Sequence, residues 1–192
     1  MALQGFDRKQ ADIQGRPVAA LLGRPAIEAA EQEQRMSTAD IDAILGRVPS
    51  GIYILTAGTG ERATGMLTSW VMQAGFEPPM VTVAIKQGRY LADWLTAGEP
   101  FVLNVVGAQQ TSLFKHFGKG FEPDEPAFEG LAVQACPRGV PILEDSVGHL
   151  ECEPSGHLDS GDHRVLLARV VRGRFQEGRQ PYVHIRKSGA SY

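Results

Sequence analysis

The sequence predicts a mainly β domain, a barrel or a sandwich, with a few short helices. Short runs rich in strand-forming residues, such as residues 52–57, 81–85 and 101–106, are separated by Gly and Pro turns. Helical patterns do not alternate regularly with these runs, as they would in a doubly wound parallel sheet. The length of 192 residues suits one domain with a single sizeable core.

The first 36 residues differ from the rest, because they combine Gly and Pro with a polar helical segment at 28–35. We expect 1–36 to be an N-terminal extension, partly disordered or draped over the domain or a partner subunit, and 37–192 to be the folded domain. A helix is expected to begin at a cap residue, Ser37 or Thr38. Its apolar face follows at helical spacing up to Val48, where VPSG ends it.

The remaining elements follow in order along the chain, each bounded by turn-forming residues. We expect a turn at 58–61, an extended stretch at 62–74, short helices at 90–97 and 112–117, and strands at 81–85, 101–106, 131–135, 147–153, 164–175 and 182–186.

Composition excludes several classes of function. The formal net charge of −3 argues against binding to nucleic acid or to a membrane surface, since such proteins carry surplus Lys and Arg. Two cysteines are too few for a disulfide framework. The chain has no bilayer-spanning apolar run, and its first residues lack the apolar stretch of a signal peptide. We therefore expect a cytoplasmic protein with neither nucleic acid nor membrane as partner.

Two motifs invite a functional reading. Residues 58–63 match the dinucleotide pattern G-x-G-x-x-A, but strand-like residues follow where a helix would have to begin, so we interpret them as a hairpin turn. His149, Glu151 and Glu153 alternate along one predicted strand and would share a face. A metal site using His149, Glu151 and His163 remains an alternative, but such alternation is typical of a solvated face, and no metal ligand is assigned.

The most informative segment is residues 62–90, because it combines groups that a flat heteroaromatic ligand with a phosphate tail requires. Hydroxyl and cationic side chains can hold a phosphate, whereas apolar walls, an amide and backbone donors can hold a ring. The residues concerned are Thr68, Ser69, Trp70, Gln73, Lys86, Arg89 and Tyr90.

Within this segment, GMLTSWVMQAGFEPPMVTVAI resembles the signature stretch of the flavin-reductase-like, FMN-binding split-barrel family. Further segments match in the family order, among them FVLNVV, LFKHFGKGF, GDHRVLLARVVRG and YVHIRKSGASY. The resemblance covers residues 37–192 and is greatest to stand-alone flavoprotein reductases and to the flavin-reductase module of flavodiiron proteins. It implies a Greek-key split β-barrel and a homodimer with the flavin near the subunit interface.

The resemblance also implies a set of site residues. His163, in the motif Gly161-Asp162-His163, would lie near the flavin face where a nicotinamide stacks. Two positions depart from the family: Gly75 stands where Ser is common, and Arg164 where Trp or Thr is common, which puts the donor preference in doubt. The implied cofactor-binding residues are Met66, Leu67, Thr68, Ser69, Trp70, Gln73, Ala74, Lys86, Arg89 and Tyr90.

The implied cofactor is FMN rather than FAD, and the implied reaction is hydride transfer from NAD(P)H to the flavin. Electrons would pass on to free flavin, to a partner protein such as a monooxygenase or a flavodiiron-type oxidase, or to another acceptor. The alternative is an FMN-holding electron carrier without NAD(P)H activity of its own. His116 and Lys119 are interpreted as helix-end charges and receive no role.

Overall fold

The computed structural model describes residues 24–190, which form two compact units. One contains the described residues up to Val48 and from Arg186 onward, and the other is Pro49–Ile185. Residues 1–23, which hold most of the predicted extension, and residues 191–192 lie outside the described part. No helix in the described part is long and apolar enough to cross a membrane.

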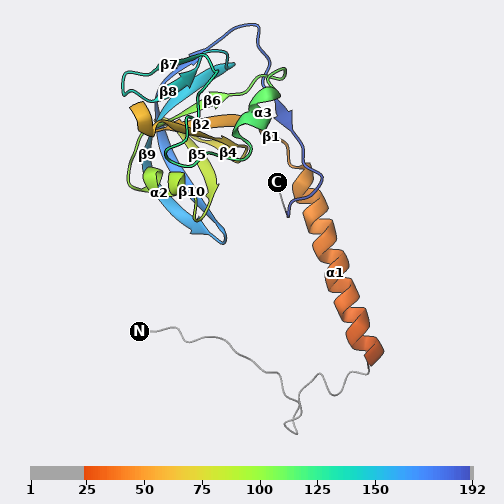
Figure 1. The fold of residues 1–192 in the computed structure, drawn as a ribbon. Helices are drawn as coiled ribbons and strands as arrows, with labels where there is room; N and C mark the ends of the chain where they lie inside the picture. Colours follow the sequence, from red (N-terminus) through yellow and green to blue (C-terminus); the bar gives the residue numbers. More distant parts are fainter. Residues whose placement is uncertain (1–23, 191–192) are drawn as a thin grey trace, which may run out of the picture. The chain divides into compact units, whose positions relative to one another are not determined.

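The larger unit is built on a seven-stranded antiparallel sheet with the order β3-β2-β6-β9-β10-β5-β4 (Figure 1). Its strands are β2 (Tyr53–Ala57), β3 (Thr64–Thr68), β4 (Val71–Phe76), β5 (Pro79–Lys86), β6 (Phe101–Val105), β9 (Gly148–Ser160) and β10 (His163–Phe175).

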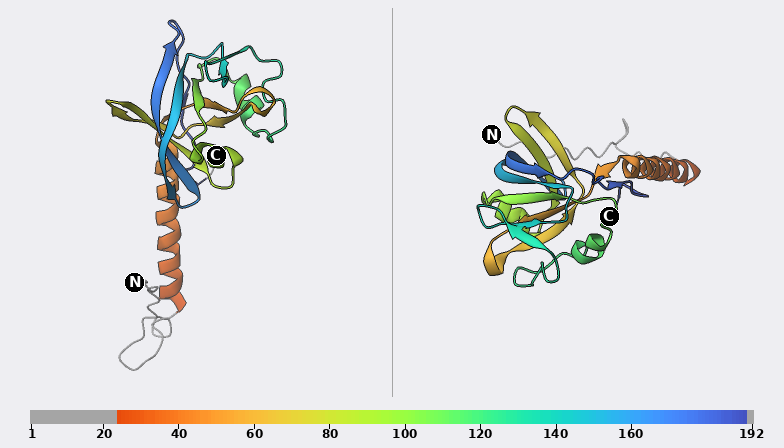
Figure 2. Two further views of the ribbon diagram at one scale, coloured as in Figure 1. Left: turned by 90° about the vertical axis from the view of Figure 1, so that its left-hand side faces the viewer. Right: turned by 90° about the horizontal axis from the view of Figure 1, so that it is seen from above.

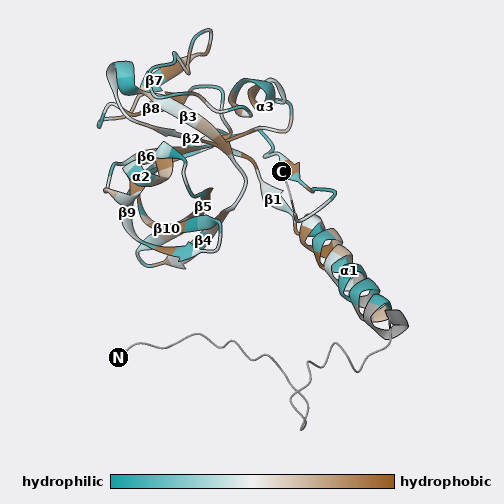
Figure 3. Ribbon diagram, turned by 60° about the horizontal axis from the view of Figure 1, so that its bottom comes forward, coloured by the Kyte–Doolittle hydropathy of each residue, from teal (hydrophilic) through white to brown (hydrophobic). Residues whose placement is uncertain are grey.

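The two edge strands of this sheet, β3 and β4, are consecutive in the chain and are joined only by Ser69 and Trp70. The sheet must therefore curl until its edges approach each other, and Figure 3 shows the strands following one another around a ring. Within the seven-stranded sheet, β3 pairs only with β2 and β4 only with β5, so the barrel stays open between these two edge strands. We call this opening, together with the end of β3 and the connecting residues Ser69 and Trp70, the seam. The predicted fold class, a mainly β split barrel, is confirmed.

Short elements complete the unit and agree closely with the sequence. Residues 58–63 are a hairpin turn with one 3-10 turn, as predicted, and the 62–74 stretch divides into β3 and β4. The strand β8 was not predicted, since its three residues are too few for a pattern. The short elements are α2 (Tyr90–Thr96), α3 (Ser112–Phe117), β1 (Ser50–Gly51), β11 (Val183–His184), β7 (Val133–Ala135) and β8 (Pro141–Leu143).

The strand β2 is buried on both faces, because neighbouring side chains enter different hydrophobic clusters. Leu55 packs into the main core inside the barrel, whereas Ile54 packs into a second cluster with Phe117 of α3. The main core includes Leu91 and Leu95 of α2, so the short amphipathic helix closes that side of the barrel. Long apolar runs in the sequence therefore mark the strands that lie between two layers.

The smaller unit consists of α1 (Arg24–Arg47) and the chain from Arg186. The predicted start at Ser37 or Thr38 is wrong: the Thr38 hydroxyl donates to the Gln34 carbonyl inside the helix. The residues before it include Ala, Glu and Gln, which are strong helix formers and need no apolar face to continue the helix. The expected boundary between residues 36 and 37 thus falls within α1.

The C-terminal residues complete the last turns of α1 with backbone hydrogen bonds. The amide of Arg186 donates to the Gly46 carbonyl at 2.9 Å, and the amide of Gly189 donates to the Asp42 carbonyl. These bonds occupy carbonyls near the end of the helix that have few partners within it. A Cβ at Gly189 would lie 2.3 Å from the Cβ of Leu45, so only glycine permits this approach.

Candidate functional site

The seam between β3 and β4 carries two hydroxyl side chains on buried residues. Thr68 ends β3 and Ser69 follows it, and their relative exposures are only 6% and 7%. Within residues 24–190, neither hydroxyl makes a side-chain hydrogen bond, and no fully buried side-chain oxygen lacks a partner, so both hydroxyl oxygens keep some access to solvent. This pair can therefore receive a hydrogen bond from a bound ligand or donate one to it.

Trp70, the second residue of the seam, is placed against His163. The two ring centroids are 4.7 Å apart with an interplanar angle of 45°. The carbonyl of Trp70 accepts a hydrogen bond from the amide of Ala84 on β5, which fixes the backbone of the seam. His163 begins β10 opposite Lys86, the last residue of β5, and is itself buried. Two predicted site residues far apart in the sequence therefore meet.

The two edge strands offer backbone groups more than side chains. Met66 packs against the main core and Leu67 against the second cluster, so their side chains lie on opposite faces of β3. Gln73 and Ala74 lie exposed on β4, where a bulge between Gln73 and Gly75 leaves Ala74 out of the pairing with β5. Edge strands keep unpaired N–H and C=O groups, which can hydrogen-bond to the rim of a planar ligand.

The three residues of the expected phosphate clamp have different environments. Lys86 and Arg89 are exposed at the two ends of the turn between β5 and α2, and their charges are accessible. The Tyr90 hydroxyl instead donates to the Phe121 carbonyl at 2.7 Å and lies 2.9 Å from the Thr64 hydroxyl. The Tyr90 hydroxyl proton is therefore already used in this hydrogen bond and is not available to a phosphate. The bond instead joins α2 to the loop that contains Phe121.

Arg89 also borders an open pocket of about 620 Å³ that the sequence did not reveal. Its guanidinium lies over Gly120, where a Cβ would be 2.9 Å from Nη1 and where φ is +76°. His116 and Lys119, which were not assigned a role, line this pocket with Arg89, and so do Glu122 and Glu125. The pocket therefore carries two permanent cations and two carboxylates, so its formal charge is close to zero.

The turn that carries His163 is held by specific polar contacts. Gly161 has φ +61°, a left-handed conformation that favours glycine, and it makes the tight turn from β9 to β10. His163 Nδ1 lies 2.8 Å from Asp162 Oδ1. This hydrogen bond is the largest of the influences that hold the pKa of the Asp162 carboxyl below its usual range, and it fixes the orientation of the imidazole.

The metal alternative fails on geometry. His149 pairs with Arg174 at one end of the β9–β10 hairpin, whereas His163 pairs with Ser160 at the other end. At about 3.3 Å per residue this separation is on the order of 30 Å. Residues 24–190 contain no group of three or more His, Cys, Asp or Glu side chains placed to hold a metal ion.

Comparisons with known proteins agree with this fold. The sequence model described as the flavin reductase like domain matches residues 45–191. A curated relative, diflavin flavoprotein A 1 of Synechocystis sp., is 39% identical over 175 residues, which cover 89% of this chain but 30% of the relative. The chain thus spans less than a third of the length of the curated relatives it matches first.

Two solved structures show how the fold is shared. The styrene monooxygenase flavin reductase SMOB of Pseudomonas putida S12 is 27% identical, with a TM-score of 0.63 over 74% of this chain and 90% of that chain. The NADH:FAD oxidoreductase SgcE6 of Streptomyces globisporus has a TM-score of 0.69 and 24% identity, over 74% of this chain and 85% of that chain. At that identity the second likeness shows the fold alone.

The sequence model covers more than half of the chain, the relatives are well above 30% identical, and the split barrel agrees with both. The chain belongs to the flavin reductase-like domain family.

Proposed function

We propose that this chain binds FMN along the β3–β4 seam, takes a hydride from NAD(P)H, and passes electrons to a flavin, a partner protein or another acceptor. The observation that carries the proposal is the seam itself. Thr68 and Ser69 are buried residues whose hydroxyls make no side-chain hydrogen bond within residues 24–190, and they lie beside a histidine whose ring contacts Trp70. A planar ligand with hydrogen-bonding edges could bond to these hydroxyls.

The residues of the chain fit this cofactor. Backbone groups of the two edge strands would bond to the ring edges, and the Thr68 and Ser69 hydroxyls would bond to the ring or to the tail. Lys86 and Arg89, accessible at the turn, would hold the phosphate. FMN supplies the hydride-accepting chemistry when it is bound, and the protein contributes binding and orientation.

His163 would position the nicotinamide of the donor. Its imidazole is buried against Trp70 and oriented by Asp162, so it presents a fixed surface rather than a mobile side chain. A fixed wall beside the reacting ring contributes through orientation, which does not require proton transfer. We therefore assign His163 to donor placement and not to an obligatory acid.

A homodimer is part of this proposal. The edge strand β4 exposes Met72 and Phe76, at 70% and 88% of their surfaces, and exposed side chains of this size favour contact with another chain. A carrier without NAD(P)H activity is the second candidate. It is supported by the length of the diflavin relatives, in which most of the chain lies outside the matched part.

The first experiment is the visible spectrum of the purified chain with FMN, before and after NADH is added without oxygen. We expect a yellow protein that loses its flavin absorbance within seconds. A yellow protein that NADH does not bleach would favour the carrier. A colourless protein that cannot be reconstituted with FMN would refute the proposal.

The seam can be tested separately with the double variant Thr68→Val, Ser69→Ala. Loss of these hydrogen bonds should raise the Kd for FMN about tenfold, measured by fluorescence titration. Thr59→Val, at an exposed position in the β2–β3 turn, is the control and should leave the Kd unchanged. Equal FMN affinities of the seam variant and the control would place the cofactor elsewhere.

A further inference from the structure

The tip of the β9–β10 hairpin is exposed, yet it carries the buried His163. The strand β9 pairs with β6 only as far as Cys152, so beyond that point the hairpin has β5 as its only strand neighbour, paired with β10. Residues 155–162 are all exposed. This end of β9 is therefore an edge with no apolar burial, and side-chain contacts must contribute to holding the tip in place.

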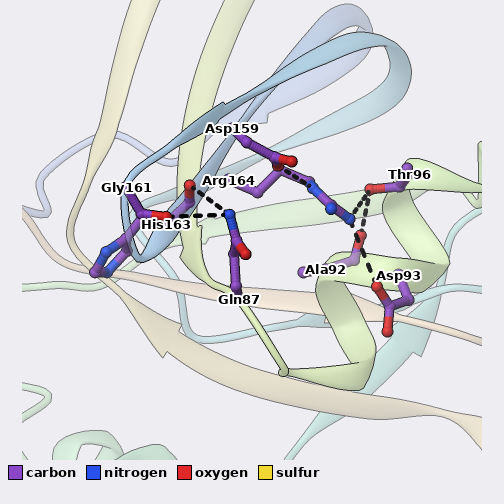
Figure 4. A network of polar contacts seen from close by, with 8 residues as sticks. All are labelled: Gln87, Ala92, Asp93, Thr96, Asp159, Gly161, His163 and Arg164. Atoms are coloured by element: carbon purple, nitrogen blue, oxygen red, sulfur yellow. Dashed lines mark hydrogen bonds and ion pairs between the residues drawn. The ribbon is translucent and has the colours of Figure 1, made fainter. Parts of the chain in front are cut away.

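Gln87 holds the tip from the β5 side (Figure 4). Its backbone amide donates to the Asp162 carbonyl at 2.9 Å. Its side-chain Nε2 donates to the Gly161 carbonyl at 3.2 Å and lies 3.5 Å from the His163 carbonyl. One exposed glutamine therefore ties the residues on both sides of Asp162 to the turn that carries Lys86 and Arg89.

Arg164 holds the tip from the α2 side. Its Nε donates to Asp159 at 2.8 Å across the hairpin, and its Nη1 donates to the Thr96 hydroxyl at 3.1 Å. The same Nη1 lies 3.5 Å from the Asp93 carboxylate. The carboxylates of Asp93 and Asp159 partly neutralise this guanidinium, which weakens its attraction for an anionic ligand. The planar fork of arginine can make these contacts together, whereas a lysine ammonium cannot.

We propose that Gln87 and Arg164 are positioning residues, which clamp the hairpin tip from two sides and so hold His163 against Trp70 for the NAD(P)H donor. Their hydrogen bonds reach the backbone and side chains around the tip, so we assign them an effect on His163 through the turn. The donor part rests on the function proposed above, whereas the clamp itself can be tested without it. Arg164, which stands where the family commonly has Trp or Thr, then has a structural role. It does not distinguish NADPH from NADH by binding the additional phosphate.

The clamp can be measured through Trp70. The chain has two tryptophans, so Trp94→Phe leaves Trp70 as the single tryptophan fluorophore. An imidazole in contact with an indole quenches its fluorescence, so Trp70 should be quenched while His163 stays in place, and His163→Ala in the same background gives the unquenched reference. In this background Gln87→Leu should lose most of the quenching. The control is Gln134→Leu, at an exposed position on β7 with no side-chain hydrogen bond in the described chain.

Steady-state kinetics tests the consequence for the donor. Gln87→Leu should raise the KM for NADH about three- to tenfold, as expected for the loss of one or two hydrogen bonds, with kcat and FMN affinity changed less than about twofold. Arg164→Lys should raise KM by a smaller factor. The control for it is Arg169→Lys, on the same strand and bound to Glu153 away from the tip.

Unchanged quenching and unchanged KM in a folded Gln87→Leu protein would overturn the clamp. If the unaltered chain oxidises no NADH, the proposed function fails, but the fluorescence result still decides the clamp. Loss of quenching would then support it, and full quenching would overturn it.

Discussion

The two ends of the β9–β10 hairpin are stabilised differently. At the base, β9 lies between β6 and β10, Cys152 belongs to the main core together with Leu103, and Leu150 packs against that core. At the tip, β9 has no second neighbour and its residues are exposed. The left view of Figure 2 shows the two strands of the hairpin, drawn in blue, running side by side. Apolar burial fixes the base, whereas polar contacts of Gln87 and Arg164 fix the tip.

The base of the hairpin therefore contributes mainly to the stability of the fold, whereas the tip contributes mainly to the placement of His163. Burial of apolar surface is non-directional and contributes most of the free energy of folding. Hydrogen bonds contribute less but define direction, and direction is what a residue such as His163 requires. His163 therefore lies beside an exposed hairpin tip, and its orientation depends on a few polar groups.

The largest expected effect is at the base. Leu103→Ala should lower the free energy of unfolding by about 3 kcal/mol, because Leu103 is fully buried and the truncation leaves a cavity. Leu158→Ala makes the same change near the tip, where the side chain is 59% exposed, and should cost less than about 0.5 kcal/mol. Urea denaturation measures both, and similar losses would refute the contrast.

The next effect is on activity and is confined to the tip. His163→Ala should lower kcat/KM for NADH about ten- to hundredfold through loss of donor placement, while FMN content stays nearly intact. His157→Ala, an exposed histidine of the same hairpin, should leave both unchanged. Loss of FMN in His163→Ala, with normal NADH kinetics in the protein that retains FMN, would contradict the assignment.

The smallest effect concerns pH and the base. Burial lowers the pKa of His149, although the nearby Glu151 opposes the shift. The folded state therefore binds this proton less readily than the unfolded chain. The resulting stability is present above the unfolded pKa of about 6.5 and is lost as the pH falls toward the folded pKa.

His149→Gln should accordingly flatten the decline of Tm between about pH 7.5 and pH 5.5. His157→Gln, the same change at an exposed position of the same strand, should retain the decline of the unaltered protein. Identical profiles for the two variants would show that His149 does not contribute.

The sequence predicted local elements well where a pattern was strong. The hairpin turn at 58–63, α2 and α3 lie where their residues indicated, since each depends on neighbours within a few positions. The start of α1 was wrong because its polar residues form a helix without an apolar face. Among the predicted site residues, Tyr90 donates its hydroxyl proton to the Phe121 carbonyl, a contact between distant residues that no local pattern indicated.

The chain by itself determined that this is a mainly β domain, because alternation, apolar runs and turn residues act over short distances. Through its resemblance, it also pointed to the seam at Thr68–Trp70. Only the tertiary structure decided that β3 and β4 are the two edges of one curled sheet, that His163 meets Trp70, and that Arg164 is occupied by Asp93 and Asp159. Such contacts join residues distant in sequence, and their partners are set by strand order and register, which no local pattern encodes.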